Sequence, residues 1–267
     1  MARIERRLSI RNGSLVLCYH AVSERWDADI SITPAALEKQ LGFLLERGYQ
    51  GATFGQAVTA PPSRKTLAVT FDDAFRSVFD LAFPILSRLG LPGTVFVPTA
   101  KVGNHGPMAW EGIEGWIGTP HEDELRGMSW EQLEHVAGAG WEVASHTRSH
   151  PHLTALNDEA LERELRASRE DCEQRLQRPC TSVAYPFGDV DDRVMDAARH
   201  AGYTAAGSVD PIPHYPPDAL NWPRVAVFYG TDWDRFQWKV SPVGVKLRNS
   251  WLWPSLHRAR RRVRGKR

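Results

Sequence analysis

The chain has 267 residues and a formal net charge of +1. With 42% hydrophobic and 24% charged residues, it can bury the core of one large domain or two small ones. No apolar run reaches the roughly 18 residues that a membrane-spanning helix needs, and the charged start MARIERRLSI lacks the apolar core of a secretory signal. The three cysteines, Cys18, Cys172 and Cys180, are too few for a disulfide framework, and an odd number cannot all pair. They also lack the close pairing of a cysteine metal site. We therefore expect reduced structural thiols in a cytoplasmic protein.

Short apolar runs alternate with longer helical patterns along the chain, without an internal repeat. Seven apolar runs are predicted as strands, over 15–20, 67–71, 93–97, 141–145, 182–186, 203–208 and 224–228. Five helices are predicted between them, from Pro34 to just before Gly48 and over about 76–89, 130–138, 157–176 and about 192–201. A Gly-rich irregular insert lies at 99–128.

This alternation of strands and helices predicts an α/β fold with a mainly parallel sheet. About seven strands, without a Gly-rich dinucleotide fingerprint, favour a barrel over an open nucleotide-binding sheet. In such barrels the chemistry lies at the C-terminal ends of the strands. The residues that follow each predicted strand are therefore the first candidates for a functional site.

Histidines are concentrated where the strand WEVAS ends. The stretch ASHTRSHPHL at 144–153 holds His146, His150 and His152, three of the ten histidines of the chain. A spacing of four residues is typical of helical zinc sites, but the strand runs directly into His146, and Pro151 disfavours helical geometry at His150. We place both imidazoles on a tight loop where they converge. The alternative is a cluster of polar surface residues without a ligand.

Two carboxylates, Asp72 and Asp73, directly follow the strand LAVTF. Adjacent strand residues point to opposite faces, but a strand that stops at this point can turn both side chains inward. Two close carboxylates are not both stable in the ionised form unless a cation lies beside them. A cation bound by one would leave the other to act as a base. The alternative is that one aspartate caps the helix that begins near Ala74.

Two histidines and one aspartate together form a nitrogen and oxygen site with three protein ligands and open positions. This pattern is typical of catalytic rather than structural zinc. It also matches non-haem Fe(II) sites, so the residues leave the identity of the metal open.

Three motifs in chain order carry a resemblance to a known family. TFDD at 70–73, HTRSH at 146–150 and AYPFG at 184–188 resemble the first three motifs of the polysaccharide deacetylase family (NodB-homology domain, carbohydrate esterase family 4). LCYHAV at 17–22 resembles the N-terminal motif of one branch, which includes the poly-N-acetylglucosamine deacetylases. The resemblance implies a distorted (β/α) barrel with fewer than eight strands. We take 1–240 as the catalytic domain and 241–267 as a tail.

The resemblance also implies roles for individual residues. Asp73, His146 and His150 would bind a divalent metal ion, zinc in the first place, with iron, cobalt or nickel as alternatives. Asp72 would be the general base, and His20 of the N-terminal motif would be the general acid. The binding region would comprise Tyr185, Pro186, Phe187, Arg224 and Trp110, with a backbone N–H near Phe187 helping to hold the oxyanion.

The chain departs from the family pattern at two places. Many members carry an arginine in the third motif that pairs with the base, and Ala184 stands at that position here. Arg224 is the candidate replacement, with an ordinary surface arginine as the alternative. Many members also end with a Leu-x-x-His motif that supplies the acid, and no such motif stands on a C-terminal strand here, which favours His20. The alternative for His20 is a buried histidine satisfied by the backbone.

Trp110 of the insert could stack on a sugar ring, because flat apolar ring faces suit aromatic side chains. The alternative is that Trp110 simply packs the insert onto the barrel.

The implied activity is metal-dependent removal of N-acetyl groups from the amino sugars of a polysaccharide, glycan or lipid-linked sugar intermediate. One alternative is hydrolysis of another C–N amide bond, such as that of an N-formyl sugar or a small cyclic amide. Another is a non-catalytic glycan-binding module on the same fold. A module that only binds glycans has no need of both a base and a full set of metal ligands, which argues against that alternative.

The C-terminal tail differs in charge from the rest of the chain. Seven of the 33 basic residues lie in HRARRRVRGKR at 257–267, which leaves 26 against 32 acidic residues, or −6, for residues 1–256. Trp251 and Trp253 precede this basic run, a pattern typical of peripheral contact with an anionic membrane. The alternative is a disordered, solvated terminus. Because the body is acidic, we expect no nucleic-acid partner.

Overall fold

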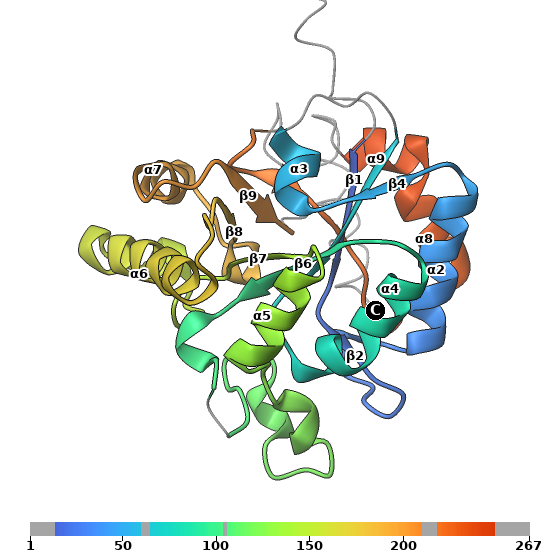
Figure 1. The fold of residues 1–267 in the computed structure, drawn as a ribbon, viewed down its shortest axis with the longest axis horizontal. Coiled ribbons are helices and arrows are strands. Elements are labelled where there is room, and N and C mark those ends of the chain that lie inside the picture. The colour runs from blue at the N-terminus through green and yellow to red at the C-terminus, as the bar shows by residue number, and fades with distance from the viewer. Residues whose placement is uncertain (1–13, 60–64, 104–105, 210–217, 249–267) are drawn as a thin grey trace, which may run out of the picture.

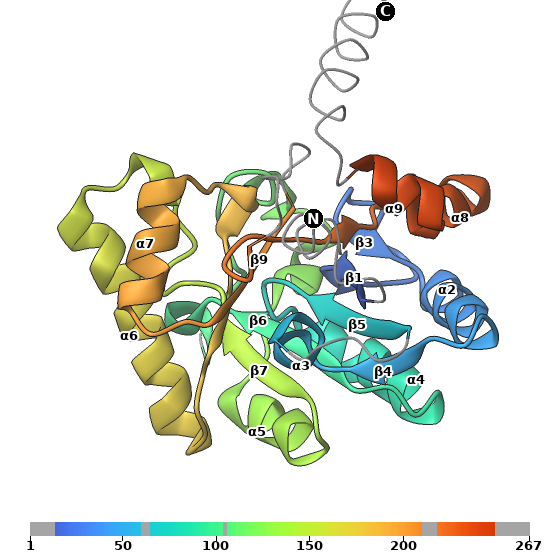
Figure 2. The same cartoon turned by 90° about the horizontal axis from the view of Figure 1, so that it is seen from above.

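The computed structural model describes residues 14–59, 65–103, 106–209 and 218–248. Its main sheet is parallel throughout and curls into a nearly closed barrel surrounded by helices (Figures 1 and 2). In their order across the sheet, the strands on the path are β10 (Trp222–Pro223), β9 (Ala205–Ser208), β8 (Ser182–Ala184), β7 (Glu142–Ser145), β6 (Gly93–Val97), β5 (Thr66–Phe71), β1 (Ser14–Tyr19) and β11 (Val225–Ala226). The predicted distorted (β/α) barrel is therefore confirmed, and all seven predicted strands are present.

One extended segment, 222–226, brings the two ends of the sheet together. Its first half is β10, in which Trp222 pairs with Gly207 of β9, and its second half is β11, in which Val225 pairs with Leu17 of β1. Arg224 lies between the two halves, and its backbone N–H donates to the carbonyl of Ser208. Strands β9 and β1 are thus joined through this closing segment (222–226), which explains why the barrel is distorted.

Several short strands were not predicted from the sequence. β4 (Gln50–Ala52) pairs with the first half of β5, and β2 (Ala21–Val22) and β3 (Ser31–Ile32) form a separate two-stranded parallel sheet. Strands of two or three residues are too short for a periodic hydrophobic pattern, so the sequence carries no clear signal for them.

The barrel interior is filled mainly by alanine and valine side chains, together with two phenylalanines. One cluster of buried side chains draws on six different strands of the sheet and on α3 (Phe54–Thr59), which only the inside of a barrel allows. Its members are Val16, Phe54, Ala57, Val58, Ala68, Phe96, Ala144, Ala184 and Ala205. The larger apolar clusters lie between the sheet and the outer helices.

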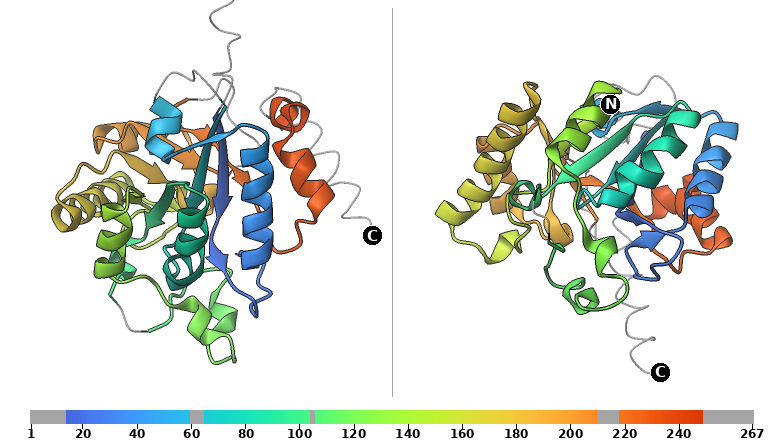
Figure 3. Two further views of the ribbon diagram at one scale, coloured as in Figure 1. Left: turned by 45° about the vertical axis from the view of Figure 1, so that its right-hand side comes forward. Right: turned by 60° about the horizontal axis from the view of Figure 1, so that its bottom comes forward.

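The outer helices begin largely where the sequence predicts. They are α2 (Pro34–Glu46), α4 (Phe83–Arg88), α5 (Trp130–Gly138), α6 (Asp158–Leu176) and α7 (Asp192–His200), and they surround the sheet in Figure 3. The predicted caps are confirmed: Thr33 accepts from the N–H of Ala36, Asn157 accepts from that of Ala160, and Ser129 forms a capping box. The helix predicted over about 76–89 is split, because its first part, Val78–Ala82, is a π-helical turn.

The chain after the closing segment is more ordered than predicted. α8 (Trp233–Val240), capped by Asp232, is followed at once by α9 (Pro242–Arg248), so the predicted boundary at 240/241 falls between two helices. The remaining tail, 249–267, lies outside the described residues, and so does the predicted membrane contact. In the described part of the chain, no helix has the length and apolarity needed to cross a bilayer.

Candidate active site

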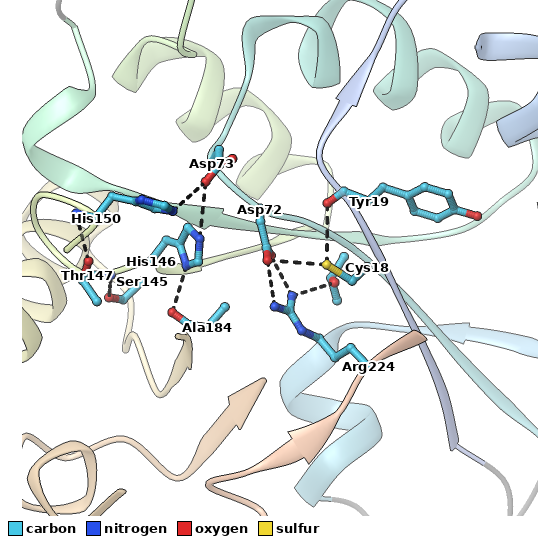
Figure 4. A network of polar contacts seen from close by, with 11 residues as sticks. Cys18, Tyr19, Asp72, Asp73, Ser145, His146, Thr147, His150, Ala184 and Arg224 are labelled. Atoms are coloured by element: carbon cyan, nitrogen blue, oxygen red, sulfur yellow. Dashed lines mark hydrogen bonds and ion pairs between the residues drawn. The ribbon is translucent and has the colours of Figure 1, made fainter. Parts of the chain in front are cut away.

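The polar residues that the sequence singles out meet at one edge of the barrel. Strands β1, β5 and β7 are parallel and end at Tyr19, Phe71 and Ser145, so the residues that follow them share one edge. Figure 4 shows Asp72 and Asp73 facing His146, His150 and Arg224 across this edge. Within the described part of the chain, the structure thus brings together residues that are far apart in the sequence.

Asp73, His146 and His150 form a buried cluster of three electron-pair donors. The Nε2 atoms of His146 and His150 lie 3.4 and 3.2 Å from the same Oδ1 atom of Asp73 (Figure 4). Two ligand atoms bound to one tetrahedral zinc ion would lie about 3.3 Å apart, since each is about 2.0–2.2 Å from the metal. The spacing of the three side chains therefore fits a single small cation.

The hydrogen bonds of the cluster also fit a cation. Nδ1 of His146 lies 2.8 Å from the carbonyl oxygen of Ala184, which can only accept, so Nδ1 carries the proton. In the neutral ring, Nε2 then directs a lone pair toward Asp73, whose Oδ1 has no hydrogen bond of good geometry. A histidine that binds a metal usually donates its other N–H to a carbonyl or carboxylate in this way. A cation between Oδ1 of Asp73 and the Nε2 lone pair of His146 would satisfy both atoms.

Strained backbone is concentrated at the same edge. In the described chain, six residues other than glycine have a positive φ. One of them, Gln177, ends helix α6. The other five are Asp73 (68°), Ala74 (51°), Thr147 (64°), His150 (66°) and Phe187 (60°). Each such residue costs roughly 1–2 kcal/mol. The turn at Asp73 allows two successive aspartates to face the same site, which a continuing strand would prevent.

Asp72 forms a buried bidentate ion pair with Arg224. Nη1 of Arg224 lies 2.6 Å from Oδ1 of Asp72, and Nη2 lies 2.7 Å from Oδ2 (Figure 4). Burial favours the protonated acid, but the charge and hydrogen bonds of the Arg224 guanidinium outweigh this effect and lower the pKa of Asp72 to about 2. Asp72 is therefore ionised at neutral pH. With only 3% of its surface exposed, Arg224 is no ordinary surface arginine.

Small residues make room for Arg224. Ala184, at the position where many family members carry arginine, pairs in register with Gly207 of β9. A Cβ atom on Gly207 would lie 2.7 Å from Nε of Arg224, closer than packed atoms approach each other. Gly207 was not predicted from the sequence. A glycine inside the strand pattern YTAAGS was the available signal, because such a glycine often marks a close approach of other atoms.

His20 and Cys18 also lie close to Asp72. One ligand atom from each of Cys18, His20 and Asp72 lies within 4.8 Å of the others, and Nδ1 of the half-buried His20 has no hydrogen-bond partner. These three residues do not suit a second metal. Burial raises the pKa of the Cys18 thiol well above its ordinary value, whereas metals bind the thiolate. In addition, Arg224 already occupies both oxygens of Asp72.

Of the three residues predicted from the third motif, only Phe187 has an exposed side chain. Tyr185 is only 1% exposed, packs between the sheet and the helices, and donates its hydroxyl to the carbonyl of Leu220. Pro186 is buried as well, so neither side chain is open to a substrate. Phe187 is 40% exposed. Its ring stacks on His152, which is not part of the donor cluster of Asp73, His146 and His150.

Trp110 lies against the metal cluster itself. Its ring stacks on His150 with a centroid distance of 4.3 Å, so one face of the indole is already covered. Trp116, in contrast, contacts Trp26 in the apolar core and packs the insert onto the barrel.

Comparison with known proteins adds the family. The sequence profile described as polysaccharide deacetylase matches residues 59–206, which is 148 of the 267 residues. The chain belongs to the polysaccharide deacetylase family. The matched region contains Asp72, Asp73, His146 and His150, so the candidate metal cluster lies within the family domain. The predicted branch with an N-terminal YH motif, and with it the role of His20, stays a prediction.

Individual relatives of this chain are distant in sequence. It is 24% identical over 201 residues to YxkH of Bacillus subtilis, covering 73% of this chain and 64% of YxkH. It is 27% identical over 155 residues to the poly-β-1,6-N-acetyl-D-glucosamine N-deacetylase of Escherichia coli K12, covering 51% of this chain and only 21% of that protein. The chain thus spans less than two thirds of either relative.

Solved deacetylase structures share the fold. The Streptococcus pyogenes deacetylase PplD superposes with a TM-score of 0.70 at 18% identity and covers 85% of this chain and 98% of its own. IcaB from Ammonifex degensii superposes with a TM-score of 0.68 at 24% identity and covers 89% and 97%. At these identities the likeness establishes the barrel architecture.

The contact between Gly207 and Arg224 can be tested by Gly207→Ala. We expect the added methyl group to lower the free energy of unfolding by about 1–3 kcal/mol, because it overpacks the barrel interior. Urea unfolding followed by circular dichroism would measure this change. Gly138→Ala in α5, where a Cβ meets nothing within 4 Å, is the matched control and should be neutral or stabilising by up to about 1 kcal/mol. In an Arg224→Met background the Gly207→Ala cost should shrink; an unchanged cost would contradict the proposed contact.

Proposed function

We propose that this chain is a metal-dependent hydrolase that removes N-acetyl groups from the amino sugars of a polysaccharide, glycan or lipid-linked sugar intermediate. The family supports carbohydrate N-deacetylation in general. Metal-dependent hydrolysis is supported by the convergence of Asp73, His146 and His150 beside an ionised carboxylate, Asp72. One group can thus bind a cation while another accepts a proton.

Asp73, His146 and His150 would hold the metal ion. Zinc suits this set of two imidazoles and one carboxylate, with iron, cobalt or nickel as alternatives. When bound, such an ion lowers the pKa of a neighbouring water molecule and polarises the substrate carbonyl.

The remaining residues would move protons and hold the substrate. Asp72, kept ionised by Arg224, would accept the proton of the attacking water, and His20 would protonate the departing amine, which is otherwise a very poor leaving group. A backbone N–H near Phe187 would donate to the oxyanion of the tetrahedral intermediate. The exposed ring of Phe187 stands at the rim, where an apolar sugar face could contact it.

Two other functions compete with this proposal. Hydrolysis of a different amide, such as an N-formyl sugar, uses the same residues, so a panel of acetylated and formylated amino sugars separates the two by product. The strained turns at Asp73 and His150 argue against a non-catalytic glycan-binding module, because such a module does not require them. Metal analysis of the purified protein separates this alternative, because such a module would purify without metal.

The base assignment can be tested with Asp72→Asn. The substitution keeps the size of the side chain and leaves all three proposed metal ligands in place. We expect the metal content to be unchanged and acetate release from acetylated amino-sugar oligomers to fall about 10²–10⁴-fold. Asp80→Asn, an exposed aspartate paired with Arg76 on the surface, is the control and should keep full activity. A fully active Asp72→Asn variant would overturn the assignment.

The role of Arg224 predicts a change in pH dependence. In Arg224→Met, Asp72 loses the charge that holds its pKa at about 2, and burial then raises that pKa above the ordinary value. Asp72 becomes protonated at higher pH, so the acidic limb of the kcat/KM profile should move to higher pH. Arg126→Met, which removes a surface arginine paired with Asp123, should leave the profile in place. An unmoved limb in a folded Arg224→Met variant would contradict this role.

We also propose that the tail makes peripheral contact with an anionic membrane, which would suit a lipid-linked substrate. Seven large apolar side chains of the described chain are exposed, and four of them lie close before the tail, namely Phe228, Tyr229, Trp238 and Val243. Residues 1–248 keep these four side chains but lack Trp251, Trp253 and the basic run at 257–267. Co-sedimentation with anionic vesicles should therefore be stronger for the full chain than for residues 1–248. Equal binding by the two, with both folded by circular dichroism, would remove this proposal.

A further inference from the structure

The two histidines of the metal cluster are oriented in different ways. His146 is fixed by a polar contact between its Nδ1 and the carbonyl of Ala184. Nδ1 of His150 is buried and has no hydrogen-bond partner. A histidine that binds a metal is normally held by a hydrogen bond from its second nitrogen, so another contact must set the ring of His150.

Aromatic rings provide that contact. The indole of Trp110 stacks on the imidazole of His150 at a centroid distance of 4.3 Å and an interplanar angle of 25°. Phe187 approaches the same imidazole at 4.6 Å and 70°. His150 thus contacts two aromatic side chains, and Trp110 belongs to the insert rather than to a strand end.

The insert is attached firmly enough to serve as a support. Its start is bonded to the histidine loop, because the N–H groups of Thr99 and Ala100 donate to the carbonyls of Thr147 and Arg148. Its end is bonded to the turn after Asp73, where Met128 donates to Ala74. Glu111, next to Trp110, also lies 3.2 Å from Nε2 of His152.

From these contacts we propose that Trp110 is a positioning residue for the metal site. Its ring holds the imidazole of His150 in the orientation that a metal ion requires, in place of the missing hydrogen bond. Because an interaction between two sites is reciprocal, a bound metal ion in turn stabilises the insert on the barrel. The inference rests on the proposed metal site, and it gives the insert a function in forming that site.

The test measures metal affinity directly. Purified full-length protein is stripped of metal, and its Kd for Zn²⁺ is determined by competition with a chromophoric chelator. We expect Trp110→Ala to weaken binding about 10–100-fold, the range seen when groups that orient metal ligands are removed. Trp110→Phe keeps an aromatic ring over His150 and should stay within about threefold of the wild type.

Trp116→Ala is the matched control, since Trp116 lies in the same insert but contacts Trp26 rather than the histidine loop. It should leave the Kd for Zn²⁺ unchanged. Amide hydrogen exchange over residues 106–128 gives a second readout: Zn²⁺ should slow exchange there in the wild type and in Trp116→Ala, but not in Trp110→Ala.

The outcomes distinguish failure of the proposed metal site from failure of the positioning role of Trp110. A wild-type chain that binds no Zn²⁺ would overturn the metal site and this inference together. A wild type that binds Zn²⁺ while Trp110→Ala binds equally well would overturn the positioning role alone. Equal losses in Trp110→Ala and Trp116→Ala would also overturn it, because the affinity would then depend on general packing of the insert.

Discussion

The ion pair between Asp72 and Arg224 is the interaction on which the rest of the site depends. It is bidentate, fully buried and formed by residues 152 positions apart. Breaking such a pair by removing one partner typically costs 3–5 kcal/mol, because the other charge stays buried without compensation. Since Arg224 lies in the segment that joins β9 to β1, the same contact couples the closure of the barrel to the ionisation of the proposed base.

The strained turns follow from the need to converge side chains from separate strands. Regular strands would send Asp72 and Asp73 to opposite faces and would carry His150 away from His146. Left-handed turns at Asp73 and His150 bring these groups together, at a cost that the surrounding core must offset. Strain of this kind persists where neighbouring contacts enforce it, and here the bonds from residues 97–100 to the histidine loop provide such contacts.

Much of the fold and most of the site were predictable from the sequence, for identifiable reasons. The seven strands are apolar runs, and the caps at Thr33, Ser129 and Asn157 are local signals. The burial of Tyr185 and the stacking of Trp110 on His150 were not predictable in this way. Whether a residue at a strand end faces the barrel or the helices depends on register, and the stacking of Trp110 on His150 depends on how an irregular insert folds back. Neither leaves a periodic pattern in the chain.

The charges of the buried groups bear on how Asp72 would act as the proposed base. Two carboxylates against one guanidinium, with neutral imidazoles, leave one uncompensated negative charge in a site from which water is largely excluded. A divalent cation would change that sum to +1, which favours the ionised form of a water molecule entering the site. A pKa of about 2 makes Asp72 a poor acceptor for the proton of ordinary water. If Asp72 is the base, as proposed, its ion pair with Arg224 would therefore allow catalysis only with a cation bound at the neighbouring site.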